Sequence, residues 1–241
     1  MTPFVPTLRP ATLVLAIGLA SCGGDLTLPD GSAVGLDLTV VDGNGQVGTV
    51  GQALPDSIVV EVTTEDGNPV ARRRVAFLAS GGGAEGFDPD TALTNSEGRA
   101  HTRWVLGTAP GPYVAQARIV ATGDTVVKAV SLQADALPGG PDTVRAAGPT
   151  SQAGLRGEAL PEPLTVMVVD RFGNPVGGVE VEWEVPDDNH GELSEDRTVT
   201  GADGISSVTW TLGRGAGLQR AEARVGDTNG SPVDFTAVVF F

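Results

Sequence analysis

The sequence predicts an all-β protein built from two tandem β-sandwiches, each with about seven antiparallel strands and no disulfide bond. Three observations carry this prediction. The chain repeats itself at an offset of about 106 residues. Within each copy, apolar residues alternate with polar ones at a period of two, which places one face of a strand in a core. Glycine-rich turn signals separate the alternating segments about every 8–12 residues.

The internal repeat aligns residues 46–118 with residues 152–224 without a gap, and about 23 of the roughly 73 aligned positions are identical. The matched motifs are Leu54-Pro55 with Leu160-Pro161, Gly67-Asn68-Pro69-Val70 with Gly173-Asn174-Pro175-Val176, and Trp104-Val105-Leu106-Gly107 with Trp210-Thr211-Leu212-Gly213. Two copies of about 100 residues are long enough to fold as self-sufficient domains, unlike solenoid repeats. We therefore expect module 1 at residues 36–136, a Pro/Gly-rich linker at 137–142 and module 2 at 143–241.

One side of each expected strand faces a core. The inward positions of module 1 are Ile58, Val60, Val62, Ala100, Thr102, Trp104, Leu106, Ala115, Ala117, Ile119, Val130, Leu132 and Ala134, and module 2 repeats them at Leu164, Val166, Val168, Ser206, Val208, Trp210 and Leu212. About seven short alternating strands per 100 residues describe an immunoglobulin-like sandwich. The chain has one cysteine, so the disulfide of antibody domains is absent. Trp104 and Phe77 are therefore expected to fill the first core by packing alone, and Trp210 and Trp183 the second.

The repeated motifs resemble those of a known family. In order along each copy they are Gly-x-Ala-Leu-Pro, an alternating valine strand, Gly-Asn-Pro-Val, Val-x-Phe/Trp, Thr-x-x-Glu/Asp-Gly, Trp-x-Leu-Gly and a closing alanine-rich strand. The chain from about Gly35 to Phe241 is similar in this respect to two bacterial immunoglobulin-like domains of group 1, the invasin/intimin-like type. The resemblance implies domains that serve mostly as spacers and adhesive stalks.

The N-terminal residues predict a cleaved leader at residues 1–21. Arg9 and the free N-terminus give it a positive end, and residues 11–20 form an apolar run. A helix of that length covers about 15 Å, too little for a hydrocarbon core of ~30 Å. The segment Leu19-Ala20-Ser21-Cys22 resembles the lipobox of bacterial lipoproteins, which implies a diacylglycerol on the Cys22 thiol and cleavage before it. The alternative is a small buried cysteine beside an uncleaved anchor.

The segment after the leader predicts a flexible tether at residues 22–35, because it is rich in Gly, Asp and Pro and has no apolar period. Gly23 stands where the inner-membrane retention signal of lipoproteins would be Asp, so the resemblance implies sorting to the outer membrane. Two or three acyl chains anchor a protein firmly where one does not.

Charge and histidine content argue against two broad classes of function. The chain has 15 basic and 30 acidic residues, and its formal net charge of −15 is the wrong sign for binding nucleic-acid phosphates. Its two histidines, His101 and His190, leave few bases for a nucleophile–histidine–acid arrangement, and the repeat places Ser207 opposite His101. His101 is expected on the outward face of its strand. The sequence therefore predicts neither an enzyme nor a nucleic-acid-binding protein.

An acidic loop in module 2 is a candidate calcium site. Its oxygen ligands are Asp187, Asp188, Glu192 and Asp196. Dense carboxylates on an extracytoplasmic loop can hold Ca²⁺, although this loop lacks the spacing of an EF-hand. The alternative is a solubilising loop that binds no metal.

An arginine run in module 1 is a second candidate site. Arg72, Arg73 and Arg74 follow the Gly-Asn-Pro-Val turn, where the second copy has Gly178-Val179-Glu180. Because the copies differ here, the fold does not require these arginines. They could bind an acidic glycan or a lipid phosphate, or they could form an ordinary solvated turn.

These features predict a non-enzymatic, lipid-anchored protein of the cell envelope that acts as a structural spacer or interaction module. The alternative is an adhesin or glycan-binding surface protein that uses its distal loops. The expected partners are the membrane, reached through the lipid on Cys22, and an envelope protein or glycan. No cofactor is expected beyond the covalent lipid.

Overall fold

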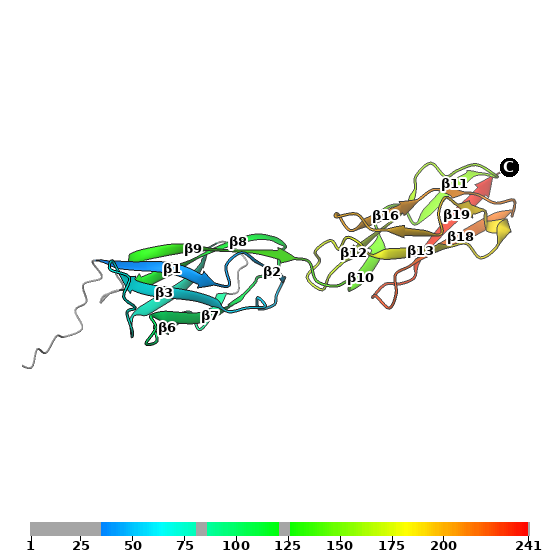
Figure 1. The fold of residues 1–241 in the computed structure, drawn as a ribbon. Coiled ribbons are helices and arrows are strands. Elements are labelled where there is room, and N and C mark those ends of the chain that lie inside the picture. Colours follow the sequence, from blue (N-terminus) through cyan, green and yellow to red (C-terminus); the bar gives the residue numbers. More distant parts are fainter. Residues whose placement is uncertain (1–34, 81–85, 121–125, 241) are drawn as a thin grey trace, which may run out of the picture. The chain divides into compact units, whose positions relative to one another are not determined.

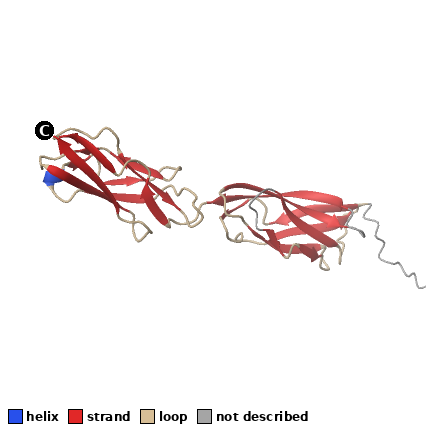
Figure 2. Cartoon of the chain, turned by 180° about the vertical axis from the view of Figure 1, so that it is seen from behind, coloured by secondary structure: helices blue, strands red, loops and turns tan. Residues whose placement is uncertain are grey.

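A computed structural model describes residues 35–80, 86–120 and 126–240. The predicted leader, Cys22 and the tether up to residue 34 lie outside the described residues. The buried side chains of the described residues form two separate cores, one in each module. Figure 1 shows the strands of each module, and Figure 2 shows that strands make up nearly all of the regular structure. The all-β prediction is confirmed.

Module 1 is a sandwich of two sheets that face each other across the first core. One sheet has the order β1-β3-β7-β5, and the other has the order β2-β9-β8-β4-β6. The strands of the first sheet are β1 (Leu36–Asp42), β3 (Ile58–Thr64), β5 (Gly86–Asp88) and β7 (Arg99–Val105). Those of the second are β2 (Gln46–Thr49), β4 (Arg74–Ser80), β6 (Thr91–Leu93), β8 (Gly111–Val120) and β9 (Val126–Leu137).

Module 2 repeats this plan around the second core. Its larger sheet has the order β11-β19-β18-β13-β15, and it faces the strands β10-β12-β16 and the short pair β14-β17. The larger sheet consists of β11 (Ser151–Leu155), β13 (Glu180–Glu184), β15 (Arg197–Val199), β18 (Gly217–Arg224) and β19 (Val233–Phe240). The facing strands are β10 (Thr143–Ala146), β12 (Leu164–Val169), β14 (Glu192–Leu193), β16 (Ile205–Val208) and β17 (Trp210–Thr211), and a single 3₁₀ turn, η1 (Asp188–His190), precedes β14.

One strand pair in each module departs from the expected antiparallel pattern. β2 runs parallel to β9, and β11 runs parallel to β19. The reason is that the first strand of module 1 changes sheets. β1 pairs with β3, the chain turns through Gly43 and Gly45 at positive φ, and β2 continues in the same direction beside β9. Glycine adopts that conformation without the steric cost that a side chain imposes.

The predicted tryptophans lie at the centres of the two cores. Trp104 and Trp210 are both 0% exposed. In module 1 Phe87 stacks on Trp104 with 5.1 Å between ring centroids, and in module 2 Trp183 lies 6.1 Å from Phe235. Each buried aromatic side chain removes a large apolar area from water. Aromatic packing thus fills both cores without a disulfide bond.

The inward register predicted from the alternation is also confirmed. The side chains of Ile58, Val60, Val62, Ala115, Ala117, Ile119 and Leu132 in module 1, and of Val166 and Val168 in module 2, are all 0% exposed. His101, which directly precedes the inward-facing Thr102 in the same strand, is exposed. A slip of one residue would have exchanged these two sets.

The glycine that closes the Thr-x-x-Glu/Asp-Gly motif is required by a close backbone approach. Gly98 has φ +74°, and a Cβ atom there would lie 2.5 Å from the carbonyl oxygen of Val62. Its counterpart Gly204 has φ +73°, and a Cβ atom there would lie 2.6 Å from the carbonyl oxygen of Val168. Both the left-handed conformation and the contact exclude a side chain.

Candidate functional site

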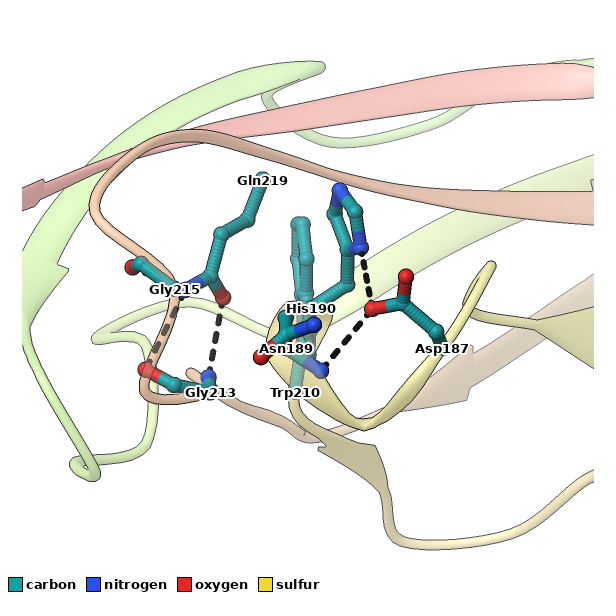
Figure 3. Close-up of polar contacts among 7 residues, drawn as sticks. All are labelled: Asp187, Asn189, His190, Trp210, Gly213, Gly215 and Gln219. Atoms are coloured by element: carbon teal, nitrogen blue, oxygen red, sulfur yellow. Dashed lines mark hydrogen bonds and ion pairs between the residues drawn. The ribbon is translucent and has the colours of Figure 1, made fainter.

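The predicted calcium loop lies at the end of module 2 where β19 finishes, and its leading carboxylate is used within the loop. Oδ1 of Asp187 accepts a hydrogen bond from the Asn189 backbone N–H at 2.9 Å and lies 3.0 Å from Nδ1 of His190. Figure 3 shows both contacts. The bond from His190, followed by that from Asn189, holds the pKa of Asp187 below its ordinary value. This carboxylate therefore caps η1 and orients His190.

The four acidic residues predicted as ligands do not form a cluster. Asp188 lies in η1 and Glu192 in β14, while the backbone carbonyl of Asp196 accepts a hydrogen bond from Trp183 N–H at 2.8 Å. Among the described residues there is no group of three or more His, Cys, Asp or Glu side chains placed to hold a metal ion. Calcium binding stays a prediction, without a gathered ligand set behind it.

The same end of module 2 is tied to the core by hydrogen bonds of the Trp210 and Gln219 side chains, and Figure 3 shows those that join Gln219 to Gly213. The indole N–H of Trp210 donates to the backbone carbonyl of His190 at 2.8 Å. The amide of Gln219 accepts from Gly213 N–H at 2.8 Å and donates to the carbonyls of Gly213 and Gly215 at 3.1 and 2.9 Å. Gln219 is 1% exposed. The two loops, 187–191 and 213–217, are therefore fixed from inside the sandwich, and we call them the loop end of module 2.

Sequence reasoning did not single out Gln219. A signal was present, because the residue is two positions before the inward Ala221 and so falls on the core face of β18. A polar side chain at a core position must find hydrogen-bond partners, and loop backbone groups are the nearest supply.

The arginine run forms the turn that leads into β4. Arg72 adopts φ +57°, the one non-glycine residue with a positive φ in the described chain, and its counterpart Gly178 has φ +80°. Thr94 holds the turn from below: its backbone carbonyl accepts from Arg72 N–H at 2.8 Å, and its hydroxyl accepts from Arg73 N–H at 2.9 Å. A side chain in the left-handed region costs roughly 1–2 kcal/mol. Module 1 thus carries an arginine where glycine fits better.

Beyond this turn, the outer face of the sheet that contains β4 and β8 combines arginines with apolar side chains. Alternate residues of β4 point outward at Arg74, Ala76 and Leu78, and β8 adds Arg118 and Val120. These residues, with Thr91 and Val126, line a shallow groove of about 260 Å³. Leu78 is 40% exposed and Val126 47%. We call this surface the arginine face of module 1, taking it to include the turn from Arg72 to Arg74.

The corresponding face of module 2 is covered by ion pairs. Glu180, Glu182 and Glu184 occupy the positions of Arg74, Ala76 and Leu78. Arg197 lies 3.0 Å from Glu180 and 2.7 Å from Glu182, and Arg224 lies 2.6 Å from Glu222 and 3.9 Å from Glu184. The fold therefore accepts either an apolar or a fully charged outer face at these positions.

Cys22, the predicted lipidation residue, lies outside the described residues. Within the described part of the chain, no helix is long and apolar enough to cross a membrane. The lipid anchor thus stays a prediction from the sequence of the leader.

Comparison with known proteins points to bacterial adhesins. The chain is 27% identical over 218 residues to the inverse autotransporter adhesin YeeJ of Escherichia coli strain K12, a match that covers 86% of this chain and 9% of YeeJ. Among solved structures, the Escherichia coli adhesin FdeC matches with a TM-score of 0.53 and 16% identity, covering 86% of this chain and 64% of the FdeC chain. No family model matches the sequence.

These similarities confirm the immunoglobulin-like sandwich fold and the resemblance to invasin/intimin-like adhesins that the repeated motifs predict. The chain spans less than two thirds of the length of either relative.

Proposed function

We propose that this chain is a non-enzymatic, lipid-anchored protein of the bacterial cell envelope, in which two sandwiches act as a spacer and interaction module. The observation that carries the proposal is the extent of the similarity to YeeJ. It runs through both modules yet covers 9% of that adhesin. Two such modules therefore correspond to a small part of a long adhesin, which is what a repeated spacing unit would be.

The mechanism is presentation rather than chemistry. The lipid on Cys22 would hold the chain at a membrane, and residues 22–35 would form a tether with a root-mean-square length of about 20 Å. Each sandwich is a rigid body because its buried aromatics and paired strands fix it. The Pro/Gly-rich segment 137–142 would join the two modules with limited bending.

A second candidate is an adhesin or glycan-binding protein that uses the loop end of module 2. The fixed position of these loops favours it, because Gln219 and Asp187 hold them before any ligand arrives. A site that is already ordered loses less conformational entropy on binding than a mobile one. YeeJ and FdeC are both described as adhesins, which supports the same candidate.

Two measurements on cells test the proposal. Radioactive fatty acid should label the wild-type protein and leave Cys22→Ser unlabelled, because the thiol is the acylated atom. Label retained on the Ser variant would rule out the anchor. Protease added to intact cells then separates a surface protein, which is cut, from one that faces the periplasm.

Adhesion separates the two candidates. A binding protein should retain purified receptors or glycans at micromolar strength and lose them when exposed residues of the loop end, such as Asp188 and Arg214, are replaced by alanine. A spacer should show no such dependence, and its function should instead follow the number of modules.

A further inference from the structure

We propose that the arginine face of module 1 docks on a membrane surface rich in anionic phospholipid, and so lays module 1 against the membrane that carries its lipid anchor. The inference rests on the proposed anchoring at Cys22, which places module 1 close to a membrane. It goes further by giving one of the two sandwiches a second, non-covalent contact with the lipid.

The chemistry of the face matches a lipid headgroup layer. Arg72, Arg73 and Arg74 stand at one end of a surface that also exposes the apolar side chains of Leu78 and Val126. Neither Arg72 nor Arg73 forms an ion pair with another described residue. Arginines pair with phosphate oxygens, and exposed aliphatic side chains enter the boundary between headgroups and acyl chains. An anionic polysaccharide would use the arginines and leave the apolar side chains without a role.

The duplicated module provides an internal control. At positions equivalent to Arg74, Ala76 and Leu78 it carries three glutamates, two of which are satisfied by Arg197. The frame therefore does not impose a cationic and apolar outer face. Arg72 also adopts φ +57°, a conformation that is strained for a residue with a side chain, whereas the equivalent Gly178 adopts a positive φ without that strain. Strain that a sister copy avoids points to a requirement outside the fold.

The position of the face fits the anchor. The chain enters module 1 at β1, and Asp37 near its start lies 3.1 Å from Lys128 of β9. Lys128 is opposite Ile119 of β8, and Ile119 is opposite Val75 of β4. The arginine turn is therefore at the same end of module 1 as the point where the tether joins. Figure 1 shows β1 beside β9 at this end.

The charge distribution of the chain explains why membrane docking would need a local cationic face. The whole chain has a net charge of −15, so an anionic surface repels most of it. At the tether end, Glu65 and Asp66 lie on the turn after β3, in the opposite sheet. The opposite sheet carries Arg99 near this end, but Glu61 and Glu97 pair with it, and Asp37 pairs with Lys128 of β9. At the tether end, Arg72 and Arg73 on the β4 side are therefore the arginines best placed to meet phosphates.

The test uses the unacylated chain from Gly23 to Phe241, so its outcome does not depend on whether Cys22 is lipidated. Binding to vesicles of phosphatidylglycerol and phosphatidylethanolamine is measured by co-sedimentation, against vesicles of phosphatidylcholine alone. We expect binding to the anionic vesicles, weaker binding to the neutral ones, and release at about 1 M salt, where the Debye length falls to ~3 Å.

The decisive variant replaces Arg72-Arg73-Arg74 by Gly-Val-Glu, the residues that module 2 carries in the same turn and that the fold therefore accommodates. Each arginine near an anionic surface strengthens binding about fivefold, so the triple variant should bind on the order of 100-fold more weakly. Leu78→Glu, again a residue of module 2, should weaken binding separately. Arg103→Thr, on the outward face of β7 in the other sheet, is the matched control and should bind within about twofold of wild type.

Three outcomes would overturn the proposal. They are equal binding to neutral and anionic vesicles, unchanged binding by a folded triple variant, and binding to soluble dextran sulfate with none to anionic vesicles. The last would identify a site for an acidic polymer in place of a membrane. If fatty acid did not label the protein but the chain still bound anionic vesicles, the covalent anchor would be ruled out and the docking face would still be supported.

Discussion

Modules 1 and 2 share one fold and one core, but their outer sheet faces differ. The centres of their cores coincide residue by residue, with Trp104 and Trp210 both fully buried. Their outer sheet faces do not, because module 1 exposes the apolar Leu78 and module 2 pairs Glu182 with Arg197. The difference teaches which positions the fold constrains: the inward ones, whose neighbours are fixed, and not the outward ones, which solvent or a partner can satisfy.

One core-facing position keeps its role in both modules although its residue differs. Its side chain holds the loop that follows the tryptophan strand. In module 1 the hydroxyl of Tyr113 donates to the carbonyl of Ala109 at 2.7 Å. In module 2 the equivalent Gln219 bonds to Gly213 and Gly215. The role of holding the loop is kept while the chemistry changes, because a phenol and an amide both reach a backbone carbonyl from a core-facing position.

The largest expected effect comes from removing a core tryptophan. Trp210→Ala should lower the free energy of unfolding of module 2 by about 3–5 kcal/mol, because it loses buried area and leaves a cavity. That is a large part of the ~5–15 kcal/mol of a typical domain. Trp104→Ala should cost a similar amount in module 1. Hydrogen-exchange mass spectrometry of the full chain under denaturant reports the two modules separately.

Each of these substitutions should leave the other module nearly unchanged, which tests the predicted boundaries at 36–136 and 143–241. His101→Ala, at an exposed position of β7, is the control and should cost less than about 0.5 kcal/mol. A loss of protection in both modules from Trp210→Ala alone would show that the two sandwiches fold as one cooperative unit.

A smaller difference is expected at the turn that follows β3 in module 1 and β12 in module 2. Asp170, 2% exposed, accepts hydrogen bonds from Phe172, Asn174 and Gly139, whereas the equivalent Thr64 hydroxyl accepts one from Asn68 N–H at 3.2 Å. Asp170→Ala leaves several donors without a partner and should cost about 1–3 kcal/mol. Thr64→Ala should cost less, because a single exposed bond is lost.

The carboxylate also makes this turn sensitive to acid. Burial by itself raises the pKa of Asp170, but hydrogen bonds from Asn174, Gly139 and Phe172 outweigh it and hold the pKa below its ordinary value. Such a group stabilises the folded state fully above its unfolded-state pKa of about 3.9 and stops doing so as the pH falls through the lower folded-state pKa. The gap between wild type and Asp170→Ala should therefore shrink from pH 7 to pH 2 in denaturation of module 2. A constant gap would contradict this.

A finer test separates the two tryptophans by their indole N–H groups. In module 2 that of Trp210 donates to His190, whereas the buried Nε1 of Trp104 has no hydrogen-bond partner among the described residues. Trp210→Phe should cost about 1 kcal/mol more than Trp104→Phe, because it leaves a carbonyl unsatisfied. Equal costs for the two variants, measured by chemical denaturation, would mean that the bond contributes nothing to stability.

The core was predictable because the alternation of apolar and polar residues shows which side chains of a strand face inward. Trp104 and Ile58 could be placed from their spacing alone, since a residue's inward or outward direction follows from its parity in the strand. The parallel pairing of β2 with β9 was not predictable in this way. It depends on a change of sheet at Gly43, and a glycine in the sequence does not say which sheet the chain enters next.

The candidate sites were less predictable for a related reason. The acidic residues of the loop were correctly found on the surface, but Asp187 turns back to bond with His190, which spacing cannot show. The divergence of the copies was more informative, because it marked Arg72 as a residue the fold does not need. Its positive φ, and the apolar face beside it, required the backbone and the partner strands to be known.

The smallest expected effect concerns that residue and has the opposite sign. Arg72→Gly removes a left-handed side chain that costs roughly 1–2 kcal/mol, and it gives back about 0.5–1 kcal/mol through the greater freedom of glycine in the unfolded chain. Module 1 should therefore be stabilised by up to about 1 kcal/mol, and the matched Gly178→Arg should destabilise module 2 by a similar amount. Chemical denaturation measures both.

The same Arg72→Gly chain should bind anionic vesicles about fivefold more weakly than wild type. A variant that is more stable and binds less would show that the arginine is kept for the surface at the expense of the fold, as functional residues in strained conformations are. Unchanged vesicle binding, or a loss of stability, would instead make Arg72 an ordinary turn residue, and the contrast between the two modules at this position would then be neutral drift.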